Sequence, residues 1–210
     1  MAALVATQPA MAKGKAAAAP VAAPAKTEKA GKKDSKAAAA ASPTGADLMK
    51  TLFDGSVPAG GIIAWYEKNL AADATVEFAG GAIKLDKKTY IGLTKDLLAS
   101  VPDFTYTSPK HDFKKKGKTQ VTWTAVVRGT HTGKPFSPIK GVPPAKPNKK
   151  APKKLENDPE TVTVTLNESG TQITKFTVNA LKGGKGFSGP VGFYLQMGGD
   201  PAKLPPPPEA

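Results

Sequence analysis

The chain has 210 residues, a formal net charge of +13 and no cysteine. The lack of cysteine excludes a disulfide framework, a thiolate zinc site and a cysteine nucleophile. No apolar run reaches the roughly 20 residues of a membrane-spanning helix, so we expect no transmembrane segment.

Most of the positive charge lies in segments that cannot form a core. Residues 1–43, rich in Ala, Lys and Pro, contain seven lysines and two acids, and residues 134–155 contain seven lysines and no acid. This composition predicts disorder for 1–43 and for the Pro-rich end 201–210, and mobility for the Lys/Pro-rich loop 134–159. Arg128 is the single arginine. Because base-specific readout favours arginine, binding of nucleic acid is disfavoured, whereas acidic partners and anionic membranes stay open.

The start of the chain leaves two localisations open. It is poor in acids and rich in alanine, as organelle transit peptides are, but it lacks their arginine. We therefore expect either a plastid address, which is the first choice, or a retained tail on a cytoplasmic protein.

Residues 44–200 are long enough for one domain. In chain order, apolar residues at helical spacing predict helices in ADLMKTLFDG (46–55), GGIIAWYEKNL (60–70) and DKKTYIGLTKDLLASV (86–101). Asp86 is the expected N-cap of the third helix.

Alternating apolar and polar residues predict the strands. The expected strands are 72–80, 103–108, 118–129, 161–166 and 171–178. Because one strand follows the early helices and the other four come after the third helix, we expect an α+β fold. In this fold the helices pack on one face of a curved antiparallel sheet.

Three short motifs carry a resemblance to a known family. GTHTG (129–133) follows an alternating strand, PDF (102–104) follows the third helix, and FYLQMGG (193–199) lies near the end. Residues 46–199 thereby resemble the SnoaL-like polyketide cyclase family of the nuclear transport factor 2-like superfamily. The resemblance implies that helices and sheet form a cone with an internal pocket.

The same resemblance implies a ligand and, in part of the family, a reaction. The pocket would bind a small hydrophobic or polyketide-like molecule, with cyclase- or isomerase-type acid–base chemistry and no cofactor. In the cyclases an Asp near the end of a late strand is the acid/base, and the matching position here is Asn179, which cannot exchange a proton. Whether the chain is an enzyme therefore stays open. The alternative is a non-catalytic interaction or dimerisation module, such as a homodimer, tethered by Lys-rich segments to acidic partners or membranes.

Three charged or titratable residues are candidates for the site. His131 is the first acid/base candidate because only histidine titrates near pH 7 without perturbation. Asp103 is the second, because burial in a pocket would raise its pKa toward a useful value. Arg128 could bind an anionic group. The alternatives are a strand-end histidine bonded to backbone, a turn carboxylate and a surface ion pair.

Aromatic residues are the expected wall of the pocket, with Asn179 as a polar contact. The preferred set is Trp65, Phe78, Tyr90 and Trp123, although core packing explains each of them equally well.

Two other kinds of site are not expected. Two separated histidines and no clustered carboxylates do not make a metal site. The glycine-rich segment GGKGFSG (183–189) lacks the spacing of a phosphate-binding loop and precedes no clear helix start, so we interpret it as a flexible lead-in.

Overall fold

The computed structural model describes residues 45–204. The segment 1–43, with the expected plastid address, lies outside the described residues, as do residues 205–210 of the Pro-rich end. The first part of that end was expected to be disordered but forms the short 3₁₀ helix η2 (Pro201–Lys203). Between residues 45 and 204 there is no helix with the length and hydrophobicity needed to cross a membrane.

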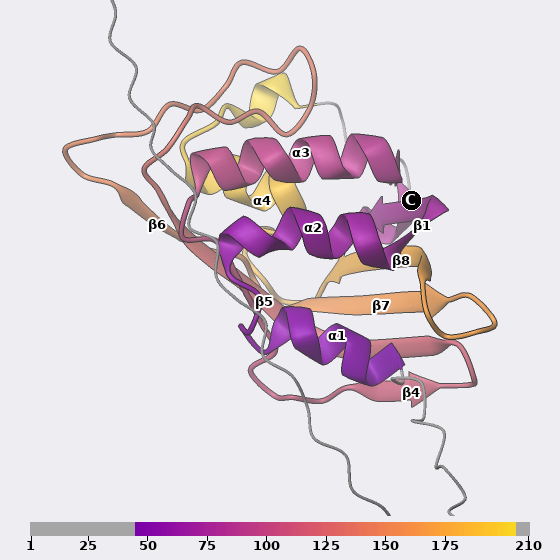
Figure 1. The fold of residues 1–210 in the computed structure, drawn as a ribbon. Coiled ribbons are helices and arrows are strands. Elements are labelled where there is room, and N and C mark those ends of the chain that lie inside the picture. The colour runs from indigo at the N-terminus through magenta and orange to yellow at the C-terminus, as the bar shows by residue number, and fades with distance from the viewer. Residues whose placement is uncertain (1–44, 205–210) are drawn as a thin grey trace, which may run out of the picture. The chain divides into compact units, whose positions relative to one another are not determined.

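Three helices lie side by side over one face of the sheet (Figure 1). They are α1 (Gly45–Phe53), α2 (Ala59–Asn69) and α3 (Lys87–Ser100). Asp86 caps α3 as expected, because its side chain accepts the N–H of Thr89 at 2.7 Å. The three helices expected from apolar spacing are therefore confirmed.

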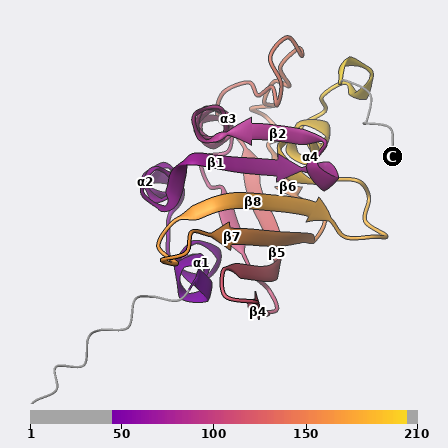
Figure 2. The same ribbon diagram turned by 90° about the vertical axis from the view of Figure 1, so that its right-hand side faces the viewer.

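The strands form one mixed, curled sheet in the order β2-β1-β8-β7-β5-β3, with β4 and β6 also paired to β5 (Figure 2). They are β1 (Leu70–Phe78), β2 (Ile83–Asp86), β3 (Thr105–Thr107), β4 (Lys114–Lys116), β5 (Gln120–His131), β6 (Lys153–Glu156), β7 (Glu160–Leu166) and β8 (Ile173–Ala180). Every pair is antiparallel except β1–β8. The long chain between β1 and β8 permits this parallel pairing, which the expected antiparallel sheet did not include.

Side-chain alternation along the strands decides which residues face the helices. In β7, alternate residues from Glu160 to Leu166 are buried, and the threonines between them are half-buried. On the outer face, the hydroxyl of Thr163 donates to the hydroxyl of Thr122 on β5 at 3.1 Å. The buried face of β7 therefore includes its first residue.

The Lys/Pro-rich loop has apolar anchors. Phe136 is fully buried and exchanges two backbone hydrogen bonds with Ala145, at 3.0 and 2.8 Å. Residues 153–156 were expected to belong to the loop but form β6, which pairs with β5. The mobility of the middle of the loop stays a prediction.

A fourth helix, α4 (Gly189–Gln196), begins where no helix start was expected. Gly189 has a φ of 57°, which favours glycine, and a Cβ there would lie 3.0 Å from the ring of Phe78. Pro190 follows in the first turn, where its missing N–H is tolerated. The helix has almost no polar face, so the sequence lacks the amphipathic period that would reveal it.

The fold class is the expected one. Four helices pack on a curled sheet, and α1, α3 and α4 enclose a space against the helix-facing side of β1, β5, β7 and β8. This space holds the candidate site.

Candidate functional site

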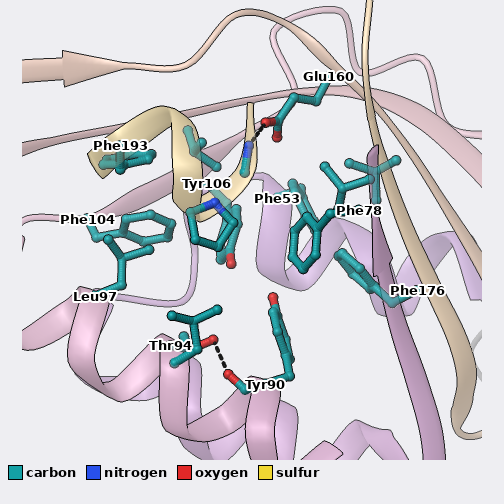
Figure 3. Close-up of a pocket in the computed structure, with 16 residues that line it drawn as sticks. Phe53, Phe78, Tyr90, Thr94, Leu97, Phe104, Tyr106, Glu160, Phe176 and Phe193 are labelled. Atoms are coloured by element: carbon teal, nitrogen blue, oxygen red, sulfur yellow. Dashed lines mark hydrogen bonds between the residues drawn. The ribbon is translucent and has the colours of Figure 1, made fainter. Parts of the chain in front are cut away.

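A cavity of about 40 Å³ lies between the helices and the sheet, and the first turn of α4 forms one wall (Figure 3). Its lining side chains come from all layers of the fold. They are Phe53, Phe78, Tyr90, Leu93, Thr94, Leu97, Phe104, Tyr106, Val127, Glu160, Val162, Phe176, Val178, Gly189, Pro190 and Phe193. The volume is room for a few water molecules.

Aromatic rings form a large part of this wall. The ring of Tyr106 lies 4.8 Å from the ring of Phe53 and 4.8 Å from that of Phe104, and Phe104 lies 5.6 Å from Phe193 on α4. The tilted and edge-on arrangements are those that aromatic pairs prefer. The wall therefore favours a molecule that is largely apolar.

Three tyrosine hydroxyls form a hydrogen-bonded chain at one side of the cavity. The hydroxyl of Tyr90 donates to that of Tyr66 at 2.9 Å, and Tyr66 donates to Tyr106 at 2.8 Å. Burial raises the pKa of all three, so the hydroxyls keep their protons at neutral pH. Two of the three hydrogens are used within the chain. One hydrogen therefore remains at an end of the chain, on Tyr106 or, if the chain reverses, on Tyr90, and both residues line the cavity.

Glu160, the first residue of β7, is the acidic residue of the lining. It is only 3% exposed. Its Oε1 accepts hydrogen bonds from the Gly189 N–H at 2.5 Å, the Ser188 hydroxyl at 2.9 Å and the Asn157 amide at 3.3 Å. Burial raises the pKa of Glu160, while these three hydrogen bonds act in the opposite direction.

The other carboxylate oxygen of Glu160 is available to a ligand. All hydrogen bonds to this carboxylate from the described residues go to Oε1, and Oε2 has none. In Figure 3, Glu160 lies at the top of the cavity and Tyr90 at the bottom, and Tyr106 lies between the two. The site thus combines one proton acceptor with one hydroxyl donor in a cavity with a largely aromatic wall.

The four aromatics expected as the wall divide into two pairs. Phe78 and Tyr90 line the cavity, whereas Trp65 and Trp123 do not. The Trp65 indole donates to the hydroxyl of Thr51 at 2.9 Å, and Trp123 packs between Phe53 and Phe113 with its indole N–H unpartnered among the described residues. Both tryptophans belong to the core beside α1.

His131 is buried at the end of β5, away from the cavity lining. Its Nε2 lies 3.2 Å from the carbonyl oxygen of Lys134. Burial lowers the pKa of His131, and the nearby charge of Lys153 adds to this effect. The geometry matches the strand-end alternative, in which the ring bonds to backbone.

The carboxylate of Asp103 is used by its neighbour on β5. Its Oδ1 accepts the N–H of Thr130 at 2.6 Å, and its Oδ2 accepts the hydroxyl of the same residue at 2.7 Å. Asp103 is exposed and does not line the cavity. It ties the turn after α3 to β5, and it lies apart from Glu160 and the tyrosines.

Arg128 and Asn179 also lie outside the lining. Arg128 donates from Nε to Glu156 at 2.6 Å in an exposed ion pair, and this contact raises its pKa. The side-chain oxygen of Asn179 accepts the N–H of Gly80 at 2.8 Å. Neither residue is placed to contact a molecule in the cavity.

Glu160 was missed by the sequence reasoning, although the sequence contains a signal for it. Val162 and Val164 define the buried face of the alternating run TVTVTL, and the same period extended back by two residues reaches Glu160. Glu160 pairs with Ala180 on β8, next to Asn179, where the acid was sought. The chain therefore has an acid in this region, on the neighbouring strand.

A metal site is not apparent in the part of the chain that the structure describes. Residues 45–204 contain no group of three or more His, Asp or Glu side chains that could hold an ion. The titratable groups of the cavity lining are the Glu160 carboxylate and the hydroxyls of Tyr90 and Tyr106.

The chain was compared with known proteins. No protein-family model and no curated protein matches it. Among solved structures, it is similar to a proposed SnoaL-like polyketide cyclase from Jannaschia sp. CCS1, with 17% identity over 64% of this chain and 83% of that chain and a TM-score of 0.47. It is also similar to IdmH, a proposed polyketide cyclase from Streptomyces antibioticus, with 20% identity over 73% and 98% of the two chains and a TM-score of 0.46. A protein with a ketosteroid isomerase-like fold from Catenulispora acidiphila DSM 44928 matches with 19% identity over 76% and 98% of the chains and a TM-score of 0.45. The chain is thus similar to SnoaL-like and ketosteroid isomerase-like structures, at low identity.

Proposed function

We propose that the domain binds a small, largely apolar carbonyl compound in the cavity and moves a proton between two of its carbon atoms. One observation carries this proposal. Glu160, the one carboxylate of the lining, has a free oxygen in an aromatic cavity whose wall also offers a spare tyrosine hydrogen. A buried carboxyl group with a raised pKa, lining a cavity beside protonated hydroxyls, is a candidate for acid–base chemistry.

The proton shift needs no group beyond these residues. Oε2 of Glu160 takes a proton from the carbon next to the carbonyl group, and negative charge develops on the carbonyl oxygen. The spare hydroxyl hydrogen of Tyr106 or Tyr90 donates to this oxygen. In a β,γ-unsaturated ketone the negative charge also spreads over the carbon–carbon double bond, and the carboxyl group returns the proton to the γ-carbon, so the product is the conjugated isomer.

The size of the cavity limits the ligand. Pockets that hold drug-sized molecules measure roughly 300–1,000 Å³, whereas this cavity has about 40 Å³. A cavity of about 150 Å³ holds one benzene ring, so even a single-ring compound needs some outward movement of α4 or of the aromatic side chains. A larger polyketide-like molecule would need a larger displacement, and a single-ring compound is therefore the better match.

The test uses cyclohex-3-enone, whose isomerisation to the conjugated ketone is followed by absorbance. We expect Glu160→Gln to lower kcat/KM by about 10²- to 10⁴-fold, because it removes the general base. Tyr106→Phe should cause a smaller loss, since Tyr90 still offers a hydrogen. Glu156→Gln, the same change at the exposed partner of Arg128, is the matched control. Equal turnover by Glu160→Gln and the unchanged protein would overturn the proposal.

A second function is favoured by the Lys/Pro-rich loop. Its lysines are all exposed, and no acid interrupts them between residues 134 and 155. We propose that this surface binds an acidic protein partner. Substituting Lys149 and Lys150 with Gln should weaken binding to polyglutamate and reduce its salt dependence, and unchanged binding would contradict this function.

A further inference from the structure

The segment that connects β6 to β7 is the docking site of α4. Residues 156–160 read ENDPE. Asp158 exchanges two hydrogen bonds with Phe187, both at 2.9 Å, and Glu160 binds the residues that open the helix. Asn157 lies between these two acids and is only 1% exposed.

The Asn157 amide connects the carboxylate to the helix. Its Nδ2 donates to Oε1 of Glu160 at 3.3 Å and to the carbonyl oxygen of Gly189 at 3.0 Å. The N–H of the same glycine donates to the same Oε1. Glu160, Asn157 and Gly189 therefore form a closed set of hydrogen bonds that uses both amide hydrogens of Asn157.

Gln196 fixes the orientation of that amide. Its Nε2 donates to Oδ1 of Asn157 at 3.0 Å, and its Oε1 accepts the N–H of Glu156 at 3.0 Å. If the Asn157 amide were flipped, its oxygen would face the Glu160 carboxylate and the Gly189 carbonyl, and all three atoms are acceptors. Only one orientation therefore satisfies the network.

Close packing of α4 on Asn157 requires a glycine. A Cβ at Gly192 would lie 2.8 Å from Oδ1 of Asn157 and 2.5 Å from the backbone of Phe187. Real Cβ atoms do not approach other atoms this closely, so a larger residue at position 192 would push the helix away. The contact between α4 and Asn157 is thus built into the sequence.

We propose that Asn157 is the positioning residue of the site: it holds Oε1 of Glu160 against α4 and so leaves Oε2 facing the cavity. The inference rests on the proposed function, because positioning matters only if Glu160 acts on a ligand. Three donors converge on one oxygen, and a carboxylate is planar, so the position of the second oxygen follows from the first.

Other charged and titratable groups also face Glu160. The negative charge of Asp158 raises the pKa of Glu160, and the carboxylate in turn raises the pKa of Tyr90 and Tyr106. The residues of β8 and α4 that line the cavity carry no titratable group. A substitution at Asn157 therefore changes the pKa of Glu160 while the other charged and titratable groups around Glu160 stay the same.

The experiment follows the Glu160 carboxyl carbon by NMR across pH in the full chain. Asn157→Asp places a second carboxylate where a donor stood, and Asn157→Ser removes the donor without adding charge. We expect the Glu160 titration to move to higher pH in both variants, and further in Asn157→Asp.

The second measurement is turnover of cyclohex-3-enone at a pH below the shifted Glu160 midpoint. There kcat of the Asn157 variants should fall by about tenfold, while KM should stay unchanged because Asn157 does not line the cavity. Asn167→Asp, in the β7–β8 hairpin, is the matched control.

The outcomes separate the two proposals. If both Asn157 variants fold and the Glu160 titration does not move, the inference is overturned, because a purely structural amide would lower stability alone. If Asn157→Asp does not fold, Asn157→Ser decides the question. If the titration moves but Glu160→Gln keeps full turnover, the proposed function fails and the link between Asn157 and Glu160 stands.

Discussion

The end of β5 and the start of β7 each carry one buried titratable side chain. One of the two side chains lines a cavity and the other does not. His131 on β5 packs against the backbone of Lys134 and faces no cavity. Glu160 on β7 has one oxygen held by α4 and the other free in a cavity. Burial perturbs the pKa of both groups, so a perturbed pKa alone does not mark a functional site. A cavity next to the titratable group distinguishes Glu160 from His131.

The largest expected effect concerns the β5 end, which we interpret as structural. Phe136→Ala removes a fully buried ring just after His131 and should lower the free energy of unfolding by about 3–5 kcal/mol. Urea denaturation measures this loss. In whatever fraction stays folded, the Glu160 titration should be unchanged. A shift of that titration would show that the two regions are coupled.

The next effect follows from the raised pKa of Glu160. A group with a raised pKa in the folded state stabilises the fold below its ordinary value, here 4.5, and loses that contribution as pH rises through the folded pKa. Glu160→Gln has no such loss. The variant should therefore gain thermal stability relative to the unchanged protein as pH rises through this window. A difference in melting temperature between the two proteins that stays the same at all pH values would contradict the assignment.

His131 should show the opposite pH dependence. Because burial lowers its pKa in the folded state, the unfolded chain takes up the proton first. Stability is then complete above the ordinary value of 6.5 and falls as pH drops from there toward the lowered pKa. His131→Gln should remove this part of the dependence in urea titrations, and it should leave turnover of cyclohex-3-enone unchanged.

The smallest effect is expected at Arg128. Its ion pair with Glu156 joins two side chains that are 49% and 58% exposed. Arg128→Ala should change the free energy of unfolding by less than about 1 kcal/mol. Ligand binding should not change, and a loss of turnover in this variant would place the site nearer to β5 than we propose.

The sequence was sufficient for the parts of the fold that have a clear period. Apolar spacing predicted α1, α2 and α3, and alternation predicted β1, β3, β5, β7 and β8. It could not predict α4, because the run PVGFYL has no polar face, or β6, because Lys153 and Lys154 give no apolar alternation. Pairing with β5 makes that segment a strand.

The site was predicted less well for a physical reason. Phe78 and Tyr90 were expected and do line the cavity, but rarity in the sequence drew attention to His131 and Arg128. Glu160 becomes a candidate only when β7, α4 and the tyrosines are brought together, and those contacts join segments distant in the chain. Its phase within the run ETVTVTL was the one local signal.

The most direct test of the central claim is a pH titration of the Glu160 carboxyl carbon by NMR, with and without cyclohex-2-enone. The account predicts a midpoint above 4.5 that moves when the ketone binds, while the ring resonances of His131 stay unchanged. A Glu160 carboxyl that titrates at its ordinary value and does not respond to the ketone would contradict it.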